Sequence, residues 1–170
     1  MKAICTAIDK TPNYVLWSVR SPHKGVEGFS ERGFPTSFEG KRARIVNWVN
    51  QPLVLQHRAL GAFMSHCGWN STIEACTLSG KPVICCPMGA EQFVNSLLLT
   101  TQMKNAVAVR GIDQEVLDSQ DIVSKVNEAM TSSDLKTRAQ EIKGLCNDCA
   151  KNTNEGAWKV LFDSLATTSS

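Results

Sequence analysis

The chain has 170 residues, and its 18 Lys and Arg residues against 16 Asp and Glu residues give a formal net charge of +2. This near balance argues against a nucleic-acid-binding domain, which is usually strongly basic. Hydrophobic residues make up 42% and charged residues 20%, which excludes a disordered chain and predicts one packed domain over residues 1–170. No apolar stretch approaches the ~20 residues of a membrane span. An odd count of seven cysteines indicates reduced thiols. We therefore expect a cytoplasmic protein without a membrane span or a nucleic-acid partner.

Helical and strand-like segments alternate along the chain. In chain order, we expect a helix over 2–9, a strand over 14–19, a long surface connection over 21–40, strands over 44–47 and 62–65, a helix over 71–78, a strand over 82–86, a helix over 91–101, a strand over 105–109, and helices over 119–130 (capped by Ser119), 133–151 and 155–165. This alternation predicts an α/β fold with a parallel sheet covered on both faces. The first expected strand follows a helix and has no strand before it.

Chemistry-bearing residues are concentrated around Gly68. A predicted strand runs through this glycine into a helix whose first turn holds Asn70 and Ser71, a geometry that presents free backbone N–H groups to an anion such as phosphate. His66, just before the turn, can donate to a second phosphate oxygen. Glu74 lies three and four residues after Ser71 and Asn70, so it can share their helical edge. A carboxylate at that place suits the paired hydroxyls of a ribose.

A purely structural interpretation of the same residues stays open. Asn70 or Ser71 caps the helix in this interpretation, and Glu74 completes a capping box. His66 would then be a strand-end histidine and Trp69 a half-buried wedge.

Flanking residues favour the ligand site over the structural interpretation. Trp48 and Gln51 upstream, with Glu91 and Gln92 downstream, supply an aromatic plate and polar side chains at the ends of neighbouring βα turns. Ligands bind at such turns in α/β sheets.

The continuous pattern over 48–92 is recognisable. Its core His66-Cys-Gly-Trp-Asn-Ser71, with Glu74 three residues further on, closely resembles the signature box of plant UDP-dependent glycosyltransferases of secondary products. The resemblance extends more loosely along nearly the whole chain. It implies a Rossmann-like parallel sheet, the C-terminal nucleotide-sugar-binding domain of a GT-B type glycosyltransferase, with its C-terminal helices over 119–165. Because the chain starts in what resembles the first helix of that domain, we expect the domain to lack its first strand and the N-terminal acceptor domain to be absent.

The resemblance also implies a role for each matching residue in binding a UDP-sugar. In the resembling proteins, the residue matching Trp48 stacks on uracil and the one matching Val49 contacts the base through its backbone. The residues matching Gln51 and Glu74 bind the ribose, Glu74 through the ribose hydroxyls. The two phosphates are held by the residues matching His66, Asn70 and Ser71, and the sugar is contacted by those matching Trp69, Glu91 and Gln92. A Gln at the position of Gln92 usually accompanies glucose, so UDP-glucose is the expected donor. The UDP-sugar is a co-substrate, and no cofactor is expected.

Two local departures from the family pattern concern the geometry of this site. The usual Ala-Pro after the leading Trp is Val49-Asn50 here, and the loss of the rigid proline is expected to loosen the base-binding loop. The spacing from Glu74 to Gly80 is one residue longer than usual, so the helix must accommodate an extra residue around 77–79.

No catalytic residue is assigned. Inverting sugar transfer needs a base that deprotonates the acceptor hydroxyl, but His23, His57 and His66 have no Asp partner at a readable spacing. The family's His–Asp pair belongs to the N-terminal domain. No metal site is expected either, because Cys146 and Cys149 supply only half of a tetrahedral zinc site.

Two hypotheses of different class follow. In the first, this is a partial chain of a UDP-glycosyltransferase that binds UDP-glucose for transfer of the sugar to a hydroxyl of a small hydrophobic plant metabolite. In the second, it is a non-catalytic, truncated UDP-sugar-binding domain. A Rossmann-type domain for another nucleotide is a more distant alternative.

Overall fold

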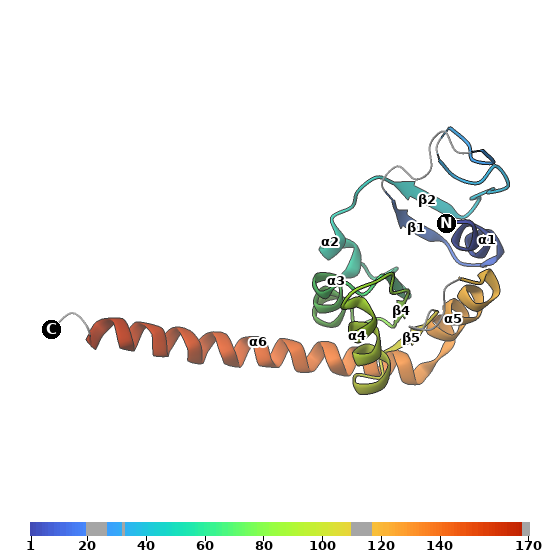
Figure 1. The fold of residues 1–170 in the computed structure, drawn as a ribbon. Helices are drawn as coiled ribbons and strands as arrows, with labels where there is room; N and C mark the ends of the chain where they lie inside the picture. The colour runs from blue at the N-terminus through green and yellow to red at the C-terminus, as the bar shows by residue number, and fades with distance from the viewer. Residues whose placement is uncertain (20–26, 32, 110–116, 168–170) are drawn as a thin grey trace.

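A computed structural model describes residues 1–19, 27–31, 33–109 and 117–167, with side chains up to residue 151 (Figure 1). Helices and strands alternate as expected. The elements are α1 (Lys2–Lys10), β1 (Val15–Ser18), β2 (Ala43–Val46), α2 (Gln51–Leu55), β3 (Phe63–Ser65), α3 (Trp69–Glu74), the π-helix η1 (Ala75–Ser79), β4 (Val83–Cys85), α4 (Gln92–Leu97), the π-helix η2 (Leu98–Gln102), β5 (Ala106–Ala108), α5 (Ser119–Thr131) and α6 (Ser133–Thr167).

All strand pairs in the described chain are parallel, but they form two sheets instead of the expected single sheet. One sheet pairs β1 with β2, with Val15 opposite Ala43. The other has the order β3-β4-β5, with Phe63 opposite Val83 and Val83 opposite Ala106. The five predicted strands are therefore confirmed in place and direction, but they lie in two sheets.

The three-stranded sheet is covered on both faces. In β4, Val83 and Cys85 belong to one buried cluster and the intervening Ile84 to another, as strand alternation requires. The first cluster contains Leu99 and residues of η1 and α6, and the second contains residues of α1 and α5. Fully burying one Val or Ile side chain stabilises a fold by roughly 1.5–3 kcal/mol. These two clusters therefore fix the ends of β3 and β4, where the candidate site lies.

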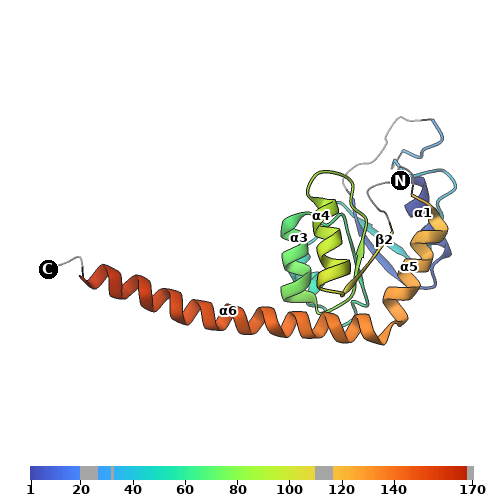
Figure 2. The ribbon, with the colours of Figure 1, turned by 60° about the horizontal axis from the view of Figure 1, so that its bottom comes forward.

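Local sequence accounts for most helix ends, with two corrections. Thr11 is extended before Pro12, which ends α1. Asp118, not Ser119, caps α5, because its carboxylate accepts the Gln120 N–H at 2.9 Å. The two helices expected over 133–151 and 155–165 are one helix, α6, which extends far beyond the rest of the molecule (Figures 1 and 2). No proline interrupts this stretch, and the Asn-Thr-Asn run at 152–154 is only mildly unfavourable in a helix.

The helix after the signature turn starts at Trp69 and continues as a π-helix over the region where the extra residue was expected. A π-turn holds one more residue than an α-turn, so η1 can accommodate the extra residue. Gly80 then closes the helix with a φ of +62°. From α6, Gln140 donates to the Gly80 carbonyl and Lys143 to the Leu78 carbonyl, both at 2.7 Å. These bonds satisfy carbonyls that a helix end leaves unpaired.

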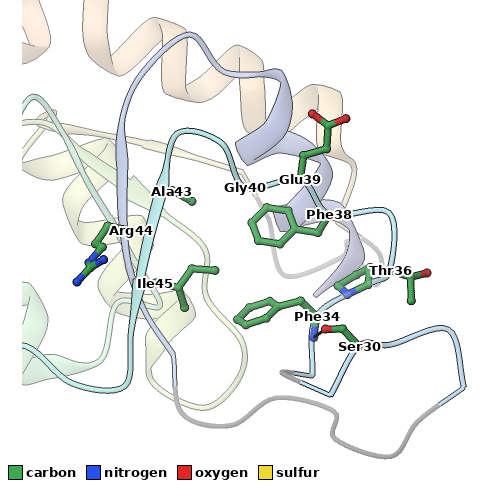
Figure 3. Close-up of a pocket in the computed structure, with 10 residues that line it drawn as sticks. Ser30, Phe34, Thr36, Phe38, Glu39, Gly40, Ala43, Arg44 and Ile45 are labelled. Carbon is green, nitrogen blue, oxygen red and sulfur yellow. Dashed lines mark hydrogen bonds between the residues drawn. The ribbon is translucent and has the colours of Figure 1, made fainter.

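The expected surface connection over 21–40 is only partly described, since residues 20–26 and 32 lie outside the described residues. Its remainder packs Phe34 and Phe38 edge-on against Trp17, with ring centroids 5.4 and 6.3 Å from the indole. A cavity of about 330 Å³ lies beside them, between these rings and Ile45 (Figure 3). Its lining comes from residues 30–45, so it is separate from the segment 48–92.

Within the described ranges, no helix is both long enough and apolar enough to cross a membrane.

Candidate functional site

The signature turn joins the end of β3 to the start of α3. Cys67 adopts a φ of +65°, unusual for a residue other than glycine. Two buried side chains hold it there: the Ser65 hydroxyl accepts the Cys67 N–H at 3.0 Å, and the Asn95 side chain donates to the Cys67 carbonyl at 2.9 Å. Asn95 lies on α4, so this bond also ties α4 to the turn. Sequence reasoning missed Asn95, because nothing distinguishes one polar helix residue from another before the fold is known.

Gly68 makes room for the ring of His66. A Cβ atom at Gly68 would lie 2.5 Å from His66 Nε2, so any larger residue would displace the imidazole. The His66 side chain is exposed. It therefore lies over the turn with its surface open to a ligand.

The structure contradicts the capping-box interpretation. Gly68 is the N-cap of α3, and no side chain caps this end. Asn70 and Ser71 lie inside the first turn, and Glu74 is the last residue of α3. The first helical bond runs from the Thr72 N–H to the Gly68 carbonyl at 3.0 Å, so the preceding N–H groups point out of the helix end. This end therefore presents backbone donors with Asn70 and Ser71 beside them.

A side-chain network joins three of the predicted site residues. The Gln51 Nε2 donates to Glu74 Oε2 at 2.8 Å and to Ser71 Oγ at 3.2 Å. All three side chains are half-buried. Residues from α2 and α3, 20 and 23 positions apart in sequence, thus form one polar edge.

The loop before Gln51 is fixed by a hydrogen bond where the resembling proteins have a proline. The Asn50 side chain caps α2 by accepting the Leu53 N–H at 3.2 Å. The expectation that Asn50 loosens this loop did not take this cap into account. Sequence reasoning also missed α2 itself, because five residues are too few to show a helical periodicity.

The cap predicts a measurable contribution to stability. Asn50→Ala should lower the free energy of unfolding by about 1 kcal/mol, because the Leu53 N–H loses its acceptor. Asn50→Asp keeps an acceptor and is the matched control, with a loss of only a few tenths of a kcal/mol expected. Urea denaturation of the three proteins measures both values. Equal losses in the two variants would contradict the cap.

Trp48 and Val49 lie in the connection between β2 and α2. The Trp48 side chain is 68% exposed, which leaves an indole face open to solvent three residues before Gln51. Val49 is half-buried. An exposed aromatic face at the rim of a polar site is suited to stacking on a base.

Glu91 and Gln92 lie at the start of α4, after the loop that follows β4. The Gln92 Oε1 accepts the N–H groups of Met88 at 2.8 Å and Gly89 at 3.2 Å. Gln92 therefore shapes its own loop and can meet a ligand through its Nε2 donors. Glu91 is exposed.

The two loops meet at one end of the sheet. The turn after β3 and the loop after β4 follow the carboxyl ends of adjacent parallel strands, where ligands of α/β sheets bind. Packing of α3 against α4 brings them together. The structure thus gathers the expected phosphate and sugar residues at one edge, with the Gln51–Glu74 network beside them.

No catalytic base emerges from the described histidines. His23 lies outside the described residues, and the His57 Nδ1 accepts the Ala59 N–H at 3.2 Å. Of the ion pairs in the described ranges, none involves His57 or His66.

The cysteines and acids offer no further centre in the described part of the chain. A hydrogen bond with the Cys85 thiol and burial both raise the pKa of Cys67, so Cys67 stays a neutral thiol at neutral pH. Among the described residues, no three His, Cys, Asp or Glu side chains are placed to hold a metal ion.

Comparisons with known proteins place the chain in one family. The family model described as UDP-glucoronosyl and UDP-glucosyl transferase matches residues 1–150. The chain is 32% identical over 156 residues to UDP-glycosyltransferase 73B1 of Arabidopsis thaliana, a match that covers 87% of this chain and 32% of that protein. It is 33% identical over 174 residues to UDP glycosyltransferase 9 of Catharanthus roseus, which covers 96% of this chain and 36% of that protein.

Solved structures agree with the sequence relatives. The Medicago truncatula UGT71G1 complexed with UDP-glucose matches with a TM-score of 0.74 and 26% identity, over 87% of this chain and 32% of that one. The Phytolacca americana UGT2 complexed with UDP-2fluoro-glucose and pterostilbene matches with a TM-score of 0.71 and 29% identity, over 84% and 32%. The chain spans about a third of the length of these relatives, and its fold is the corresponding part of a GT-B plant glycosyltransferase. On this evidence, the chain belongs to the UDP-glucoronosyl and UDP-glucosyl transferase family.

Proposed function

We propose that the segment 48–92 binds UDP-glucose, and that the chain serves the transfer of glucose to a hydroxyl of a small hydrophobic plant metabolite. The observation that carries this proposal is the hydrogen-bonded network of Gln51, Ser71 and Glu74 beside the open first turn of α3. Acceptors for ribose hydroxyls and donors for a diphosphate thus lie next to each other.

The uridine occupies the α2 side of the site in this proposal. The exposed Trp48 indole stacks on uracil, and the Val49 backbone contacts the edge of the base. Gln51 and Glu74 then meet the ribose. The carboxylate of Glu74 accepts from the ribose hydroxyls, which take the place of the Gln51 amide in the unliganded network.

The diphosphate lies at the start of α3. Backbone N–H groups of the first turn, with the side chains of His66, Asn70 and Ser71, donate to its oxygens, and the positive end of the helix dipole favours its charge. The same donors stabilise the UDP leaving group as its charge develops during transfer.

The glucose extends toward α4, where Trp69, Glu91 and the Nε2 group of Gln92 contact its hydroxyls. The complex of the Medicago truncatula relative with UDP-glucose supports this choice of donor. The pterostilbene complex of the Phytolacca americana relative supports a small hydrophobic acceptor. The proposal requires no cofactor.

We also propose a cytoplasmic location. All seven cysteines lie in the described part of the chain, and no disulfide joins any two of them. Reduced thiols are typical of the cytosol.

A non-catalytic UDP-sugar-binding domain is the second candidate. The observation that favours it is that neither described histidine forms an ion pair with a carboxylate in the described part of the chain. Both candidates share the same binding site, so the binding experiment below tests the feature common to them.

Replacing Trp48 by Ala tests the proposed site. Loss of base stacking should weaken UDP binding by about 1–3 kcal/mol. Tyr14, an aromatic side chain that is 89% exposed and lies outside the site, supplies the matched control: Tyr14→Ala should leave the affinity unchanged. Isothermal titration calorimetry with UDP measures the three dissociation constants. Equal affinities for the folded Trp48→Ala and unsubstituted chains would remove Trp48 from the site.

A further inference from the structure

Asn95 is a buried polar residue of α4 whose side chain contacts the signature turn. Its Nδ2 donates to the Cys67 carbonyl at 2.9 Å, across 28 positions of sequence. Its backbone N–H donates to the Glu91 carbonyl at 3.0 Å, one turn earlier in the same helix. α3 and α4 lie side by side (Figures 1 and 2). One side chain of α4 is thus bonded to the backbone of the turn that opens α3.

The bond from Asn95 fixes the plane of the peptide between Cys67 and Gly68. This peptide is trans, and the C=O and N–H groups of a planar trans peptide point in opposite directions. Because the Cys67 carbonyl points toward Asn95, the Gly68 N–H points away from it. No group in the described part of the chain accepts a hydrogen bond from this N–H. The turn therefore holds one free backbone donor immediately before those of the first turn of α3.

Gly68 makes reversal of this peptide plane easy. Reversal changes the φ of Gly68 from −60° to about +120°, a region that glycine populates without a steric penalty. The reversed plane presents the Cys67 carbonyl oxygen where the Gly68 N–H was. An anion beside the turn would then meet a partial negative charge instead of a donor, whereas free backbone N–H groups are what an anion site requires. The orientation of this one peptide therefore affects anion binding.

Two buried side chains hold the two successive peptides of the turn. The Ser65 hydroxyl accepts the Cys67 N–H at 3.0 Å and so fixes the peptide before Cys67. Asn95 fixes the peptide after it. The first constraint comes from β3 and the second from α4, so the orientation of the Gly68 N–H depends on the packing of α4.

We propose that Asn95 is a positioning residue for the diphosphate, which orients the Gly68 N–H toward the phosphate oxygens. Asn95 is itself buried, so it acts through the turn and does not contact the ligand. The inference rests on the proposed function and deepens it, since it concerns how the same site recognises a diphosphate. Because Asn95 lies three residues after Gln92, the same bond also fixes the phosphate donors relative to the residues proposed to contact the sugar.

A purely structural role for Asn95 predicts a different result. If its bond only tied α4 to the turn, its loss would weaken uridine and UDP binding alike, through a smaller fraction of folded chain. The positioning role predicts a loss confined to ligands that carry the diphosphate. The ratio of the uridine dissociation constant to the UDP dissociation constant separates the two, because partial unfolding raises both constants by the same factor.

Two substitutions of Asn95 test the positioning role. Asn95→Ala removes the donor, and Asn95→Asp replaces it with a carboxylate, which accepts only and favours the reversed plane. Each should lower the ratio about 10- to 100-fold, the effect of losing one hydrogen bond to a charged group. NMR titrations of the full chain with uridine and with UDP measure the constants, at mildly alkaline pH so that the new carboxyl group is ionised.

Asn105→Asp is the matched control. Asn105 is also a buried amide, but its Nδ2 faces the Cys76 thiol of η1 at 4.0 Å and not the signature turn. This substitution places the same acid in the same core, so it should lower the melting temperature and leave the ratio unchanged.

The Gly68 amide of the unsubstituted chain supplies a second measurement, which does not depend on how well a variant folds. Its resonance should shift saturably with UDP and scarcely with uridine. An unchanged Gly68 resonance, a ratio retained by both Asn95 variants, or a ratio lowered equally by Asn105→Asp would overturn the role of Asn95 while UDP binding itself stands. An unsubstituted chain that binds UDP no more tightly than uridine would instead contradict the proposed diphosphate site, and this inference with it.

Discussion

Glu74→Ala should weaken UDP binding about 10- to 100-fold. Glu74 accepts from Gln51 at 2.8 Å in the unliganded chain, and in the proposed complex it is the acceptor for the ribose hydroxyls. A hydrogen bond to a charged group contributes about 1.5–3 kcal/mol, and leaving its partners unsatisfied costs a similar amount. UDP and UMP share the ribose, so calorimetry should find both weakened alike, while uracil binding scarcely changes.

A control separates this effect from stability. Glu128 is an exposed acid on α5, paired with Lys125 at 2.7 Å, and Glu128→Ala should leave UDP affinity unchanged. If Glu74 served only the packing of α3, its removal would lower the melting temperature and leave the affinity of the folded fraction intact. That outcome would contradict the assigned role.

The 170-residue chain alone should not transfer glucose to any acceptor at an enzymatic rate. In the proposed complex its residues hold the diphosphate, but neither His57 nor His66 has a carboxylate partner among the described ion pairs that would make it a base. General base catalysis contributes about 10²–10⁴ to such rates, and acceptor positioning contributes more. Incubation with UDP-glucose and a panel of phenolic and terpenoid alcohols, followed by mass spectrometry, measures the product.

Multiple turnovers that co-purify with the chain would contradict this expectation. Loss of that activity in His66→Ala would then identify His66 as a base in addition to its place over the signature turn. Product amounts of one turnover or less that do not increase with protein concentration would agree with the expected result.

The strands were predictable because they are short apolar runs separated by turn residues. The run Val83–Cys85 is buried on both faces, and a continuous apolar stretch is what such a central strand requires. Helix lengths were harder to predict. The division of the C-terminal segment at 152–154 was wrong, since no proline or cap there stops α6, and Asp118 took the capping position expected for Ser119.

The sequence pattern predicts which residues make up the candidate site, and it did not predict their geometry. The pattern at 66–74 predicts the turn, but the same residue types at the same spacing fit both a capping box and a ligand site. Only the folded backbone distinguishes them: Gly68 is the N-cap of α3, and the Glu74 carboxylate accepts a hydrogen bond from Gln51 instead of completing a cap. Asn95 and the cap at Asn50 act through hydrogen bonds that depend on the folded chain, so no local pattern could have identified them.

An NMR titration of the isotopically labelled chain with UDP tests whether the segment 48–92 binds the nucleotide. We expect saturable shifts at the Trp48 indole and the Gln51 side-chain amide, and in the backbone of 66–74. The amide resonances of Phe34 and Phe38, which line the separate cavity, should not shift. Shifts confined to that cavity, or no saturable shift at Trp48, Gln51 and 66–74 in a folded chain, would contradict the assignment of this segment as a UDP site.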